Sequence, residues 1–372
     1  MKKIINDRIE LLRKSLAENK IDTLMVLVEE NRHYLSGFTG EDTQFDETAG
    51  ALFITESKLI LATDSRYKLQ AKNEAPLFKI VCYKEGLEKE LPNIADILGT
   101  KRLGFESVRL SCKQHNKMTN ELKSLGMKVE LVPVEDMVEN LRLTKDENEI
   151  DILRKALSLA ESVFIRIKST IKPGMTEKQL AWAMEKEMRE AGAQALSFPT
   201  IVASGPNSAL PHAIPSDRKL KTGEPILFDW GAKLDGYCSD ISRTVIMGAP
   251  DEKFKKVFAT VRDAQKMATD AIKPGISSKA VDKIARDHID KSGFKGKFGH
   301  GLGHGTGLAI HEHPRLSPLK NTALKTNMVF TVEPGIYIPG WGGIRLENMA
   351  VVRNDGVEVL NTIDPADFLI EI

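Results

Sequence analysis

Four acidic residues in the C-terminal half of the chain occur as two pairs. Asp229 and Asp240 form one pair, Glu333 and Glu347 form the other, and the first acid of each pair ends an apolar run that follows a Leu-Lys-Thr tripeptide. Four buried carboxylates repel one another and lose their hydration, so they stay ionised together only beside a cation. The two pairs therefore predict a site for divalent metal ions and, with it, a metalloenzyme.

The sequence around these acids repeats, which predicts a duplicated domain. The tripeptide Leu-Lys-Thr begins at residues 220 and 324, and the tetrapeptide Ile-Lys-Pro-Gly begins at residues 171 and 272. An amphipathic stretch follows each tetrapeptide, so we expect helices over residues 177–191 and 278–292. Two copies of one α+β unit, packed face to face, would bring all four carboxylates to a pseudo-two-fold axis.

Each pair of acids flanks a predicted β-hairpin whose loop length decides where the side chains point. A tight turn is expected near residues 234–236, and a loop with an even number of residues places the first pair on one face. The two acids would lie directly opposite each other with the loop Leu234-Asp235, or diagonally with the loop Asp235-Gly236. In the second hairpin, an odd loop centred on Gly340 sets the second pair directly opposite each other.

Four histidines are further candidates. His300 and His304 lie in a glycine-rich segment that His311 follows. Glycine lets the backbone approach a ligand closely, so at least one of these three is expected to be a ligand. His212 lies in a Gly-Pro-Asn-Ser loop, where spacing favours a surface role and a site role equally. A zincin helix is excluded because Arg315 stands where the second histidine is needed, and no Gly-Xaa-Ser-Xaa-Gly motif occurs.

The composition of the 372-residue chain argues against several other classes of protein. Its 53 basic and 52 acidic residues nearly cancel, which leaves no electrostatic signature for nucleic acid or an anionic membrane. No apolar stretch approaches the length that spans a bilayer, and no signal-peptide core follows the N-terminal lysines. Three separated cysteines predict a reducing compartment rather than a disulfide framework. We therefore expect a cytoplasmic protein.

The first third of the chain alternates short strands and helices, which predicts a small α/β domain with a mixed sheet. A hairpin is expected within residues 51–62, and helices are expected over residues 87–98 and 113–125. The predicted strands are Thr23–Val28, Ala51–Ile54, Leu59–Ala62, Lys79–Cys82 and Val129–Val132.

We place the boundary between two domains, 1–140 and 141–372, before a long helix that begins near Lys145. Thr144 and Glu147 fit a capping box at its start. An apolar stripe then runs from Ile150 to Ile167 at helical spacing, which predicts a face buried in the core.

The candidate ligands occur in the order found in a known family. Asp229, Asp240, His304, Glu333 and Glu347 resemble the metal ligands of the pita-bread metallopeptidases, which include methionine aminopeptidase, prolidase and aminopeptidase P. The sequence segments on which the resemblance is based are Pro211–Ala213, Phe228–Thr244, Gly303–Pro314 and Val332–Asn348. Residues 34–40 and 62–67 resemble the creatinase-like N-terminal domain of the aminopeptidase P and prolidase branch.

The resemblance implies a role for each residue of the site. Asp229 would bind one metal ion, His304 and Glu333 the other, and Asp240 and Glu347 would bridge the two. His212 and His311 would contact the scissile group, Glu333 would also move a proton, and Tyr337 and Arg345 would support the ligands.

The resemblance also implies a cofactor, a substrate and an activity. An oxygen-rich ligand set suits two Mn²⁺ ions, with Co²⁺, Fe²⁺ or Zn²⁺ as alternatives. The expected activity is that of an Xaa-Pro aminopeptidase, which cleaves before a proline at the second position of a peptide. The alternatives are an Xaa-Pro dipeptidase (prolidase) and, more remotely, a non-catalytic peptide-binding module. A homodimer that binds neither nucleic acid nor membrane is expected.

Overall fold

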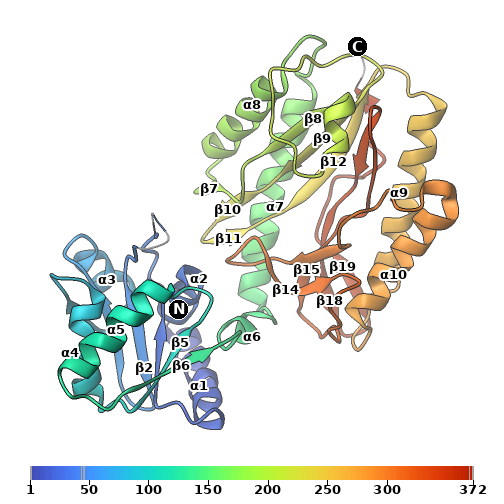
Figure 1. The fold of residues 1–372 in the computed structure, drawn as a ribbon. Coiled ribbons are helices and arrows are strands. Elements are labelled where there is room, and N and C mark those ends of the chain that lie inside the picture. Colours follow the sequence, from blue (N-terminus) through green and yellow to red (C-terminus); the bar gives the residue numbers. More distant parts are fainter. Residues whose placement is uncertain (1, 43, 45–46, 368, 371–372) are drawn as a thin grey trace. The chain divides into compact units, whose positions relative to one another are not determined.

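The computed structural model describes residues 2–42, 44, 47–367 and 369–370 and divides into two compact units (Figure 1). Unit 1 is Met1–Arg142 and unit 2 is Leu143–Ile372. The division that we predict after residue 140 lies two residues before this boundary. In the described part of the chain, no helix has both the length and the apolar composition needed to cross a bilayer.

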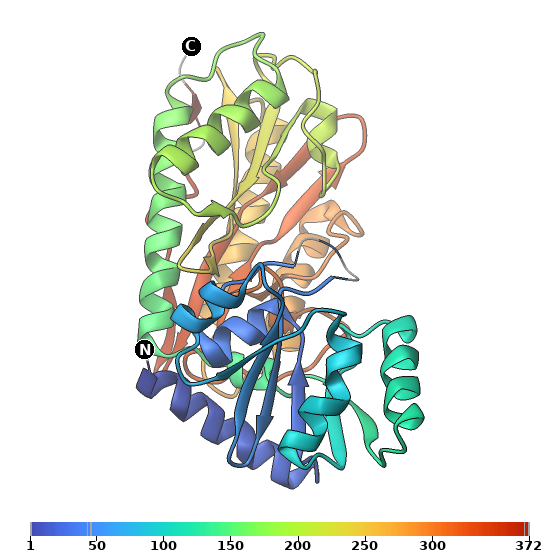
Figure 2. The ribbon, with the colours of Figure 1, turned by 90° about the vertical axis from the view of Figure 1, so that its left-hand side faces the viewer.

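Unit 1 is a mixed sheet with helices on both faces, as its alternating sequence predicts (Figure 2). The strand order is β4-β3-β2-β1-β5-β6, and only β2 runs antiparallel to its neighbours. The strands are β1 (Thr23–Val26), β2 (Ala51–Thr55), β3 (Leu59–Thr63), β4 (Lys79–Cys82), β5 (Arg102–Glu106) and β6 (Glu130–Val134). The helices are α1 (Lys2–Glu18), α2 (Glu29–Ser36), α3 (Lys68–Glu74), α4 (Leu87–Leu98), α5 (Cys112–Ser124) and α6 (Glu139–Arg142).

The predicted hairpin is β2–β3, which confirms that expectation. Strand β5 was not predicted, although it lies next to the central strand β1. Its sequence, Arg-Leu-Gly-Phe-Glu, has only two apolar residues and charged ends, so it lacks the pattern of a buried strand. A Cβ atom at Gly104 would lie 3.0 Å from the Ile21 side chain, so a larger residue there would require that side chain to shift.

Unit 2 begins with α7 (Glu147–Lys168), whose predicted apolar stripe is buried. The predicted cap is wrong. Asp146, not Thr144, caps this helix, and it forms a capping box with Glu149 through bonds of 2.9 Å in both directions. Lys145 stays outside the helix because its backbone N–H donates to Asn327 (2.9 Å) and its ammonium group pairs with Glu312 (2.8 Å).

The two halves of unit 2 repeat the same hydrogen bonds, which confirms the duplication. Gly174 donates to the carbonyl of Leu220 (3.0 Å), and Gly275 donates to that of Leu324 (2.7 Å). The isolated bridges Thr176↔Lys219 and Ser277↔Ala323 correspond in the same way. The matching helices are α7 and α8 (Glu177–Glu190) in the first half, and α9 (Glu252–Asp270) and α10 (Ser278–Ile289) in the second. Of these, α9 was not predicted.

The strands of unit 2 lie between the two helix pairs (Figure 1). One sheet has the order β20-β12-β9-β8, and another has the order β14-β13-β15-β18-β19. Apolar residues of α9 and α10 pack with those of β15 to β18 in one core. The bounds are β7 (Ala195–Leu196), β8 (Ile201–Ser204), β9 (Pro225–Trp230), β10 (Ala232–Leu234), β11 (Tyr237–Cys238), β12 (Ile241–Met247), β13 (Gly303–Gly305), β14 (Glu312–Leu316), β15 (Val329–Val332), β16 (Gly335–Ile338), β17 (Gly342–Arg345), β18 (Asn348–Arg353), β19 (Gly356–Val359) and β20 (Leu369–Ile370).

Candidate active site

The first hairpin adopts the second of the two loops that its sequence allows. Leu234 pairs with Tyr237, so the loop is Asp235-Gly236, and both loop residues have positive φ (47° and 82°), as tight hairpin turns require. The same register continues to Asp229, which lies opposite Ser242. Asp229 and Asp240 are therefore diagonal neighbours on one face, which is one of the two arrangements left open by the sequence.

The second hairpin places its acids directly opposite each other, as predicted. Val332 pairs with Asn348 on one side of the acids, and Gly335 pairs with Arg345 on the other, in one register. That register puts Glu333 across from Glu347 and leaves a three-residue loop centred on Gly340 between Ile338 and Gly342.

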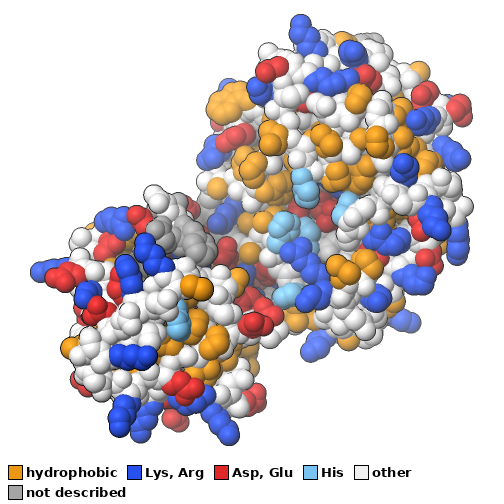
Figure 3. Space-filling view, in the orientation of Figure 1, with side chains coloured by type: hydrophobic (Ala, Val, Ile, Leu, Met, Phe, Trp, Pro, Cys, Tyr) orange, Lys and Arg blue, Asp and Glu red, His pale blue; other side chains and the backbone are white. Residues whose placement is uncertain are grey.

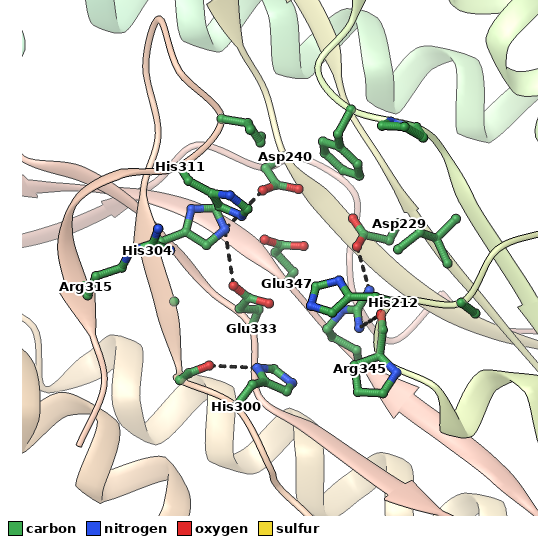
Figure 4. A pocket seen from close by; sticks show the side chains of 18 of the residues that line it. His212, Asp229, Asp240, His300, His304, His311, Arg315, Glu333, Arg345 and Glu347 are labelled. Atoms are coloured by element: carbon green, nitrogen blue, oxygen red, sulfur yellow. Dashed lines mark hydrogen bonds and ion pairs between the residues drawn. The ribbon is translucent and has the colours of Figure 1, made fainter. Parts of the chain in front are cut away.

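The two hairpins bring their acids together with a histidine from β13 (Figure 4). Ligand atoms of Asp240, His304 and Glu347 all lie within 4.8 Å of one another. His304 Nε2 is 3.5 Å from both Asp240 Oδ2 and Glu333 Oε1. Such a cluster of donor atoms from separate segments of the chain is the arrangement that a metal ion needs.

These side chains line a cavity of about 560 Å³ in unit 2. On the molecular surface, histidines surround a group of acids in a hollow of this unit (Figure 3). All the predicted ligands and histidines line the cavity, as does Arg345, whereas Tyr337 lies behind Arg345. The lining comprises Phe198, Pro199, Ile201, Pro211, His212, Ala213, Ile214, Asp229, Asp240, His300, Gly301, Gly303, His304, Ile310, His311, Arg315, Ser317, Glu333, Arg345 and Glu347.

The protonation state of His304 suits a metal ligand. Its Nδ1 lies 3.0 Å from the Gly305 carbonyl oxygen, to which it donates its proton. Nε2 therefore keeps its lone pair and faces the carboxylates. Burial lowers the pKa of His304 to about 3, so the ring is neutral at physiological pH.

The four carboxylates are short of protein hydrogen-bond donors. Burial, reinforced by repulsion from the other acids, raises the pKa of Asp240 and Glu347 well above ordinary values, and it raises that of Glu333 to about 7. Asp229 Oδ1 is buried and has no hydrogen-bond partner among the described residues. Ser242 is near Asp229, but its single hydroxyl proton goes to Glu347 Oε2 (2.7 Å). A divalent cation would satisfy these oxygens, so the residues present fit a metal centre.

Arg345 is the one cation that contacts the acids directly in the described part of the chain. It donates to Asp229 Oδ2 (2.6 Å), Ser242 Oγ (2.8 Å) and the Tyr337 hydroxyl (3.0 Å). Burial opposes its charge, but Tyr337 and the surrounding acids together raise the pKa of Arg345 well above its usual value. Burial also raises the pKa of Tyr337 to about 12, so the phenol stays protonated. This arrangement orients Asp229 and is consistent with the supporting role expected for Tyr337 and Arg345.

Family comparisons agree with this geometry. Residues 151–354 match the model of metallopeptidase family M24, and residues 8–144 match that of the creatinase/prolidase N-terminal domain. The chain belongs to metallopeptidase family M24. It is thus a metallo-exopeptidase with the pita-bread fold, of the prolidase and aminopeptidase P branch, as the sequence motifs imply.

Several M24 relatives match along nearly their entire length. The solved structure of an Xaa-Pro dipeptidase from Bacillus anthracis is 37% identical and superposes with a TM-score of 0.92, covering 99% of this chain and all of the other. The Xaa-Pro dipeptidase of Pyrococcus furiosus is 35% identical over 96% of this chain and 98% of its own. The structure of an X-Pro aminopeptidase from Thermotoga maritima is 35% identical, with a TM-score of 0.88, over 97% and 99% of the two chains.

In this M24 domain, the histidines other than His304 take different positions around the cavity. The ring of His311 packs edge-on against that of His304, with 4.4 Å between centroids. His212 reaches the cavity from the loop after β8. His300 is held by the Gly301 carbonyl (2.8 Å) and the Tyr337 hydroxyl (2.9 Å). Of the three histidines in the glycine-rich region, His304 is therefore the one that joins the acids.

Arg315 is a site residue of the M24 domain that our sequence analysis missed. It lies on β14 directly across from His304 and lines the cavity. Its guanidinium group is partly buried and donates no hydrogen bond to any described residue. The sequence alone shows only that the arginine at position 315 rules out a zincin motif. Its position follows from the β13–β14 register, which no local pattern reveals.

Proposed function

We propose that this protein is an Xaa-Pro dipeptidase that depends on two divalent metal ions. The observation that carries the proposal is Arg315, a cation without a hydrogen-bonded partner among the described residues, in the same cavity as the acids and His304. A dipeptidase must recognise the free carboxylate one residue beyond the bond it cleaves. A guanidinium group suits this task because it can bind a carboxylate through two parallel hydrogen bonds.

The dipeptidase, which is the alternative in our sequence analysis, is better supported than the aminopeptidase that we expected first. Relatives named as Xaa-Pro dipeptidases match nearly the whole chain, in sequence and in structure. The similarity to the Thermotoga maritima X-Pro aminopeptidase keeps the first expectation open to experiment.

The proposed metal ligands are the five residues predicted from the sequence. Asp229 would bind one ion, His304 and Glu333 the other, and Asp240 and Glu347 both. The orphaned Asp229 Oδ1 and the Nε2 lone pair of His304 support this assignment. When bound there, two divalent ions would supply Lewis-acid chemistry, lowering the pKa of the attacking water and polarising the scissile carbonyl. The oxygen-rich set suits Mn²⁺, with Co²⁺, Fe²⁺ or Zn²⁺ as alternatives.

The remaining residues would bind substrate and move a proton. His212 and His311 line the cavity and would donate hydrogen bonds to the carbonyl oxygen as negative charge develops on it, which is worth about 3 kcal/mol for a well-aligned donor. Thr331 donates to Glu333 Oε1 (3.2 Å), so Oε2 is available to take the proton of the attacking water. Glu333 would then pass that proton to the leaving proline nitrogen.

Substrates of different length test the proposal. After Mn²⁺ loading, we expect rapid hydrolysis of Xaa-Pro and slow hydrolysis of Xaa-Pro-Yaa and Met-Ala-Ser. Preferential cleavage of Xaa-Pro-Yaa would show an aminopeptidase instead, and preference for Met-Ala-Ser would contradict the branch.

An Arg315→Ala variant tests the carboxylate-binding role. Loss of a charge-assisted hydrogen bond costs about 1.5–3 kcal/mol, so KM for Xaa-Pro should rise by about tenfold to a hundredfold. Arg315→Lys should restore part of the loss. Xaa-Pro amide, which lacks the carboxylate, is the control: its hydrolysis should be equal in the wild type and in Arg315→Ala. An equal loss with both substrates would contradict the role.

The homodimer and the cytoplasmic location remain predictions. One chain has a mass of 41.3 kDa, so sedimentation at twice that mass would support the dimer.

A further inference from the structure

A buried acid outside the cavity holds both ends of the loop that carries His212. Glu177, the first residue of α8, is fully buried. Its Oε1 accepts hydrogen bonds from the backbone N–H (2.7 Å) and hydroxyl (2.9 Å) of Ser204, where β8 ends. Its Oε2 accepts from the N–H (3.0 Å) and hydroxyl (2.6 Å) of Ser216. The Asn207 amide lies 3.1–3.3 Å from both oxygens. One carboxylate thus joins the two ends of a loop.

The opposite side of this loop contacts the second hairpin. Arg345, the partner of Asp229, donates to the Pro211 carbonyl (3.0 Å), and Gly343 N–H donates to Ser208 Oγ (2.8 Å). His212 follows Pro211, and its exposed ring forms no hydrogen bond with a described residue. The position of the His212 backbone beside the cavity is therefore set by the loop, which is attached at its ends to Glu177 and near its tip to the acid-bearing hairpin.

The second half of unit 2 has a comparable device. Asp282 on α10 is buried, and its Oδ1 accepts from Leu302 N–H (3.0 Å). Asp282 also pairs with Arg286 (2.8 Å), which donates to the His300 carbonyl (2.7 Å). In each half, an acid on the second helix thus fixes the backbone of a segment that brings a histidine to the cavity.

We propose that Glu177 is a positioning residue that sets His212 over the metal-binding acids. The kinetic test of this inference rests on the proposed function, because it measures hydrolysis of Xaa-Pro. The carboxylate accepts hydrogen bonds from two backbone N–H groups and two hydroxyls at the two ends of the loop. A buried N–H group left without an acceptor destabilises the folded protein. A glutamine has only one acceptor oxygen, and its NH₂ group would face donors. Glu177→Gln would therefore release one end of the loop and leave the five metal ligands in place.

The decisive experiment is a double-mutant cycle with Xaa-Pro as substrate. Glu177→Gln should lower kcat by about tenfold, because a small displacement of a reacting group is enough for such a loss. KM and metal content should change little. In a His212→Ala background, Glu177→Gln should lower kcat no further, because the residue through which it acts is gone. Glu106→Gln is the matched control, since it alters a buried acid with several donors in unit 1, and it should leave kcat unchanged in both backgrounds.

Two outcomes would overturn the proposal: the same loss from Glu177→Gln with and without His212, or a loss of bound metal in proportion to activity. If Glu177→Gln does not fold, Ser216→Ala takes its place, because it removes only one donor to Glu177. It should lower kcat by about threefold in the wild type and should have no effect in His212→Ala.

Hydrogen exchange separates this proposal from the proposed function. Glu177→Gln should speed amide exchange in residues 204–216 and leave the amides of residues 300–305 unchanged. If the wild type hydrolyses no Xaa-Pro dipeptide, the proposed function fails, whereas the exchange result still decides whether Glu177 holds the loop. Unchanged exchange in residues 204–216 would overturn the positioning role.

Discussion

Glu106 in unit 1 and Asp240 in unit 2 are both buried acids with contrasting surroundings. Glu106 Oε2 accepts from the backbone N–H groups of Leu27 and Val28 (both 2.6 Å), and Oε1 accepts from the Asn31 amide (2.6 Å). Asp240 accepts no hydrogen bond from the described residues and lies beside three other acids. Burial alone therefore does not distinguish a metal ligand. What sets the cavity apart is a group of buried acids that together have fewer hydrogen-bond donors than carboxylate oxygens.

Substituting the proposed bridging acids tests this contrast most severely. Asp240→Asn or Glu347→Gln should remove bound metal and lower kcat/KM on the order of a thousandfold, because each is a proposed bridging ligand. Metal analysis of the purified protein and Xaa-Pro hydrolysis measure the two effects. Glu106→Gln, the control, should keep both metal and activity. Turnover by Asp240→Asn without bound metal would contradict the contrast.

Metal removal should destabilise unit 2 and spare unit 1. A ligand present at a thousand times its Kd stabilises the folded state by about 4 kcal/mol. Chelation should therefore speed amide exchange around residues 229–240 and 333–347, and exchange in β1 and β5 should be unchanged. Equal acceleration in both units would mean that the metal is not held where we propose.

The stability of unit 1 should depend on pH because of Glu106. Burial raises the pKa of Glu106 from 4.5 to about 7. Its folded pKa exceeds its unfolded pKa, so its stabilising contribution is complete below pH 4.5 and is lost as the pH rises through about 7. The change amounts to about 3 kcal/mol. Amide exchange in unit 1 at pH 5 and pH 8, corrected for intrinsic rates, measures it. In Glu106→Gln this slope should disappear; an unchanged slope would exclude Glu106 as its source.

The smallest change is expected at Tyr337, which acts on Asp229 only through Arg345. Tyr337→Phe removes one hydrogen bond to Arg345 and one to His300, each worth about 1 kcal/mol. Only the bond to Arg345 acts on Asp229, so we expect a fall in kcat/KM of less than about tenfold with metal content retained. Loss of metal in this variant would show that Tyr337 is as important as a ligand.

Much of the active-site geometry was predictable because it depends on short-range patterns. Whether a hairpin loop has an even or an odd number of residues decides how the two flanking acids face each other, and this depends only on residues within 15 positions of one another. For this reason the position of Glu333 opposite Glu347 was predicted correctly. The stripe on α7 follows from helical spacing alone. For the first hairpin, the sequence left two loops open, and the structure has Asp235-Gly236, where both residues adopt positive φ.

Other features were decided by contacts between distant residues. The cap at Asp146 depends on Lys145 being held by Asn327 and Glu312. Strand β5 is recognisable by its place beside β1 rather than by its own residues.

The sequence alone is enough to specify an acidic site with pseudo-two-fold symmetry. This follows from the identity and order of the acids, the repeated sequence motifs and the spacing of the hairpins. Residue type and chain spacing suffice for that, because pleating alternates side chains between faces over a few residues. The positions of Arg315 beside His304 and of Glu177 beneath the His212 loop were decided by the tertiary structure. Both depend on pairing between segments whose relative register is set by packing of the whole unit, and no local pattern carries that information.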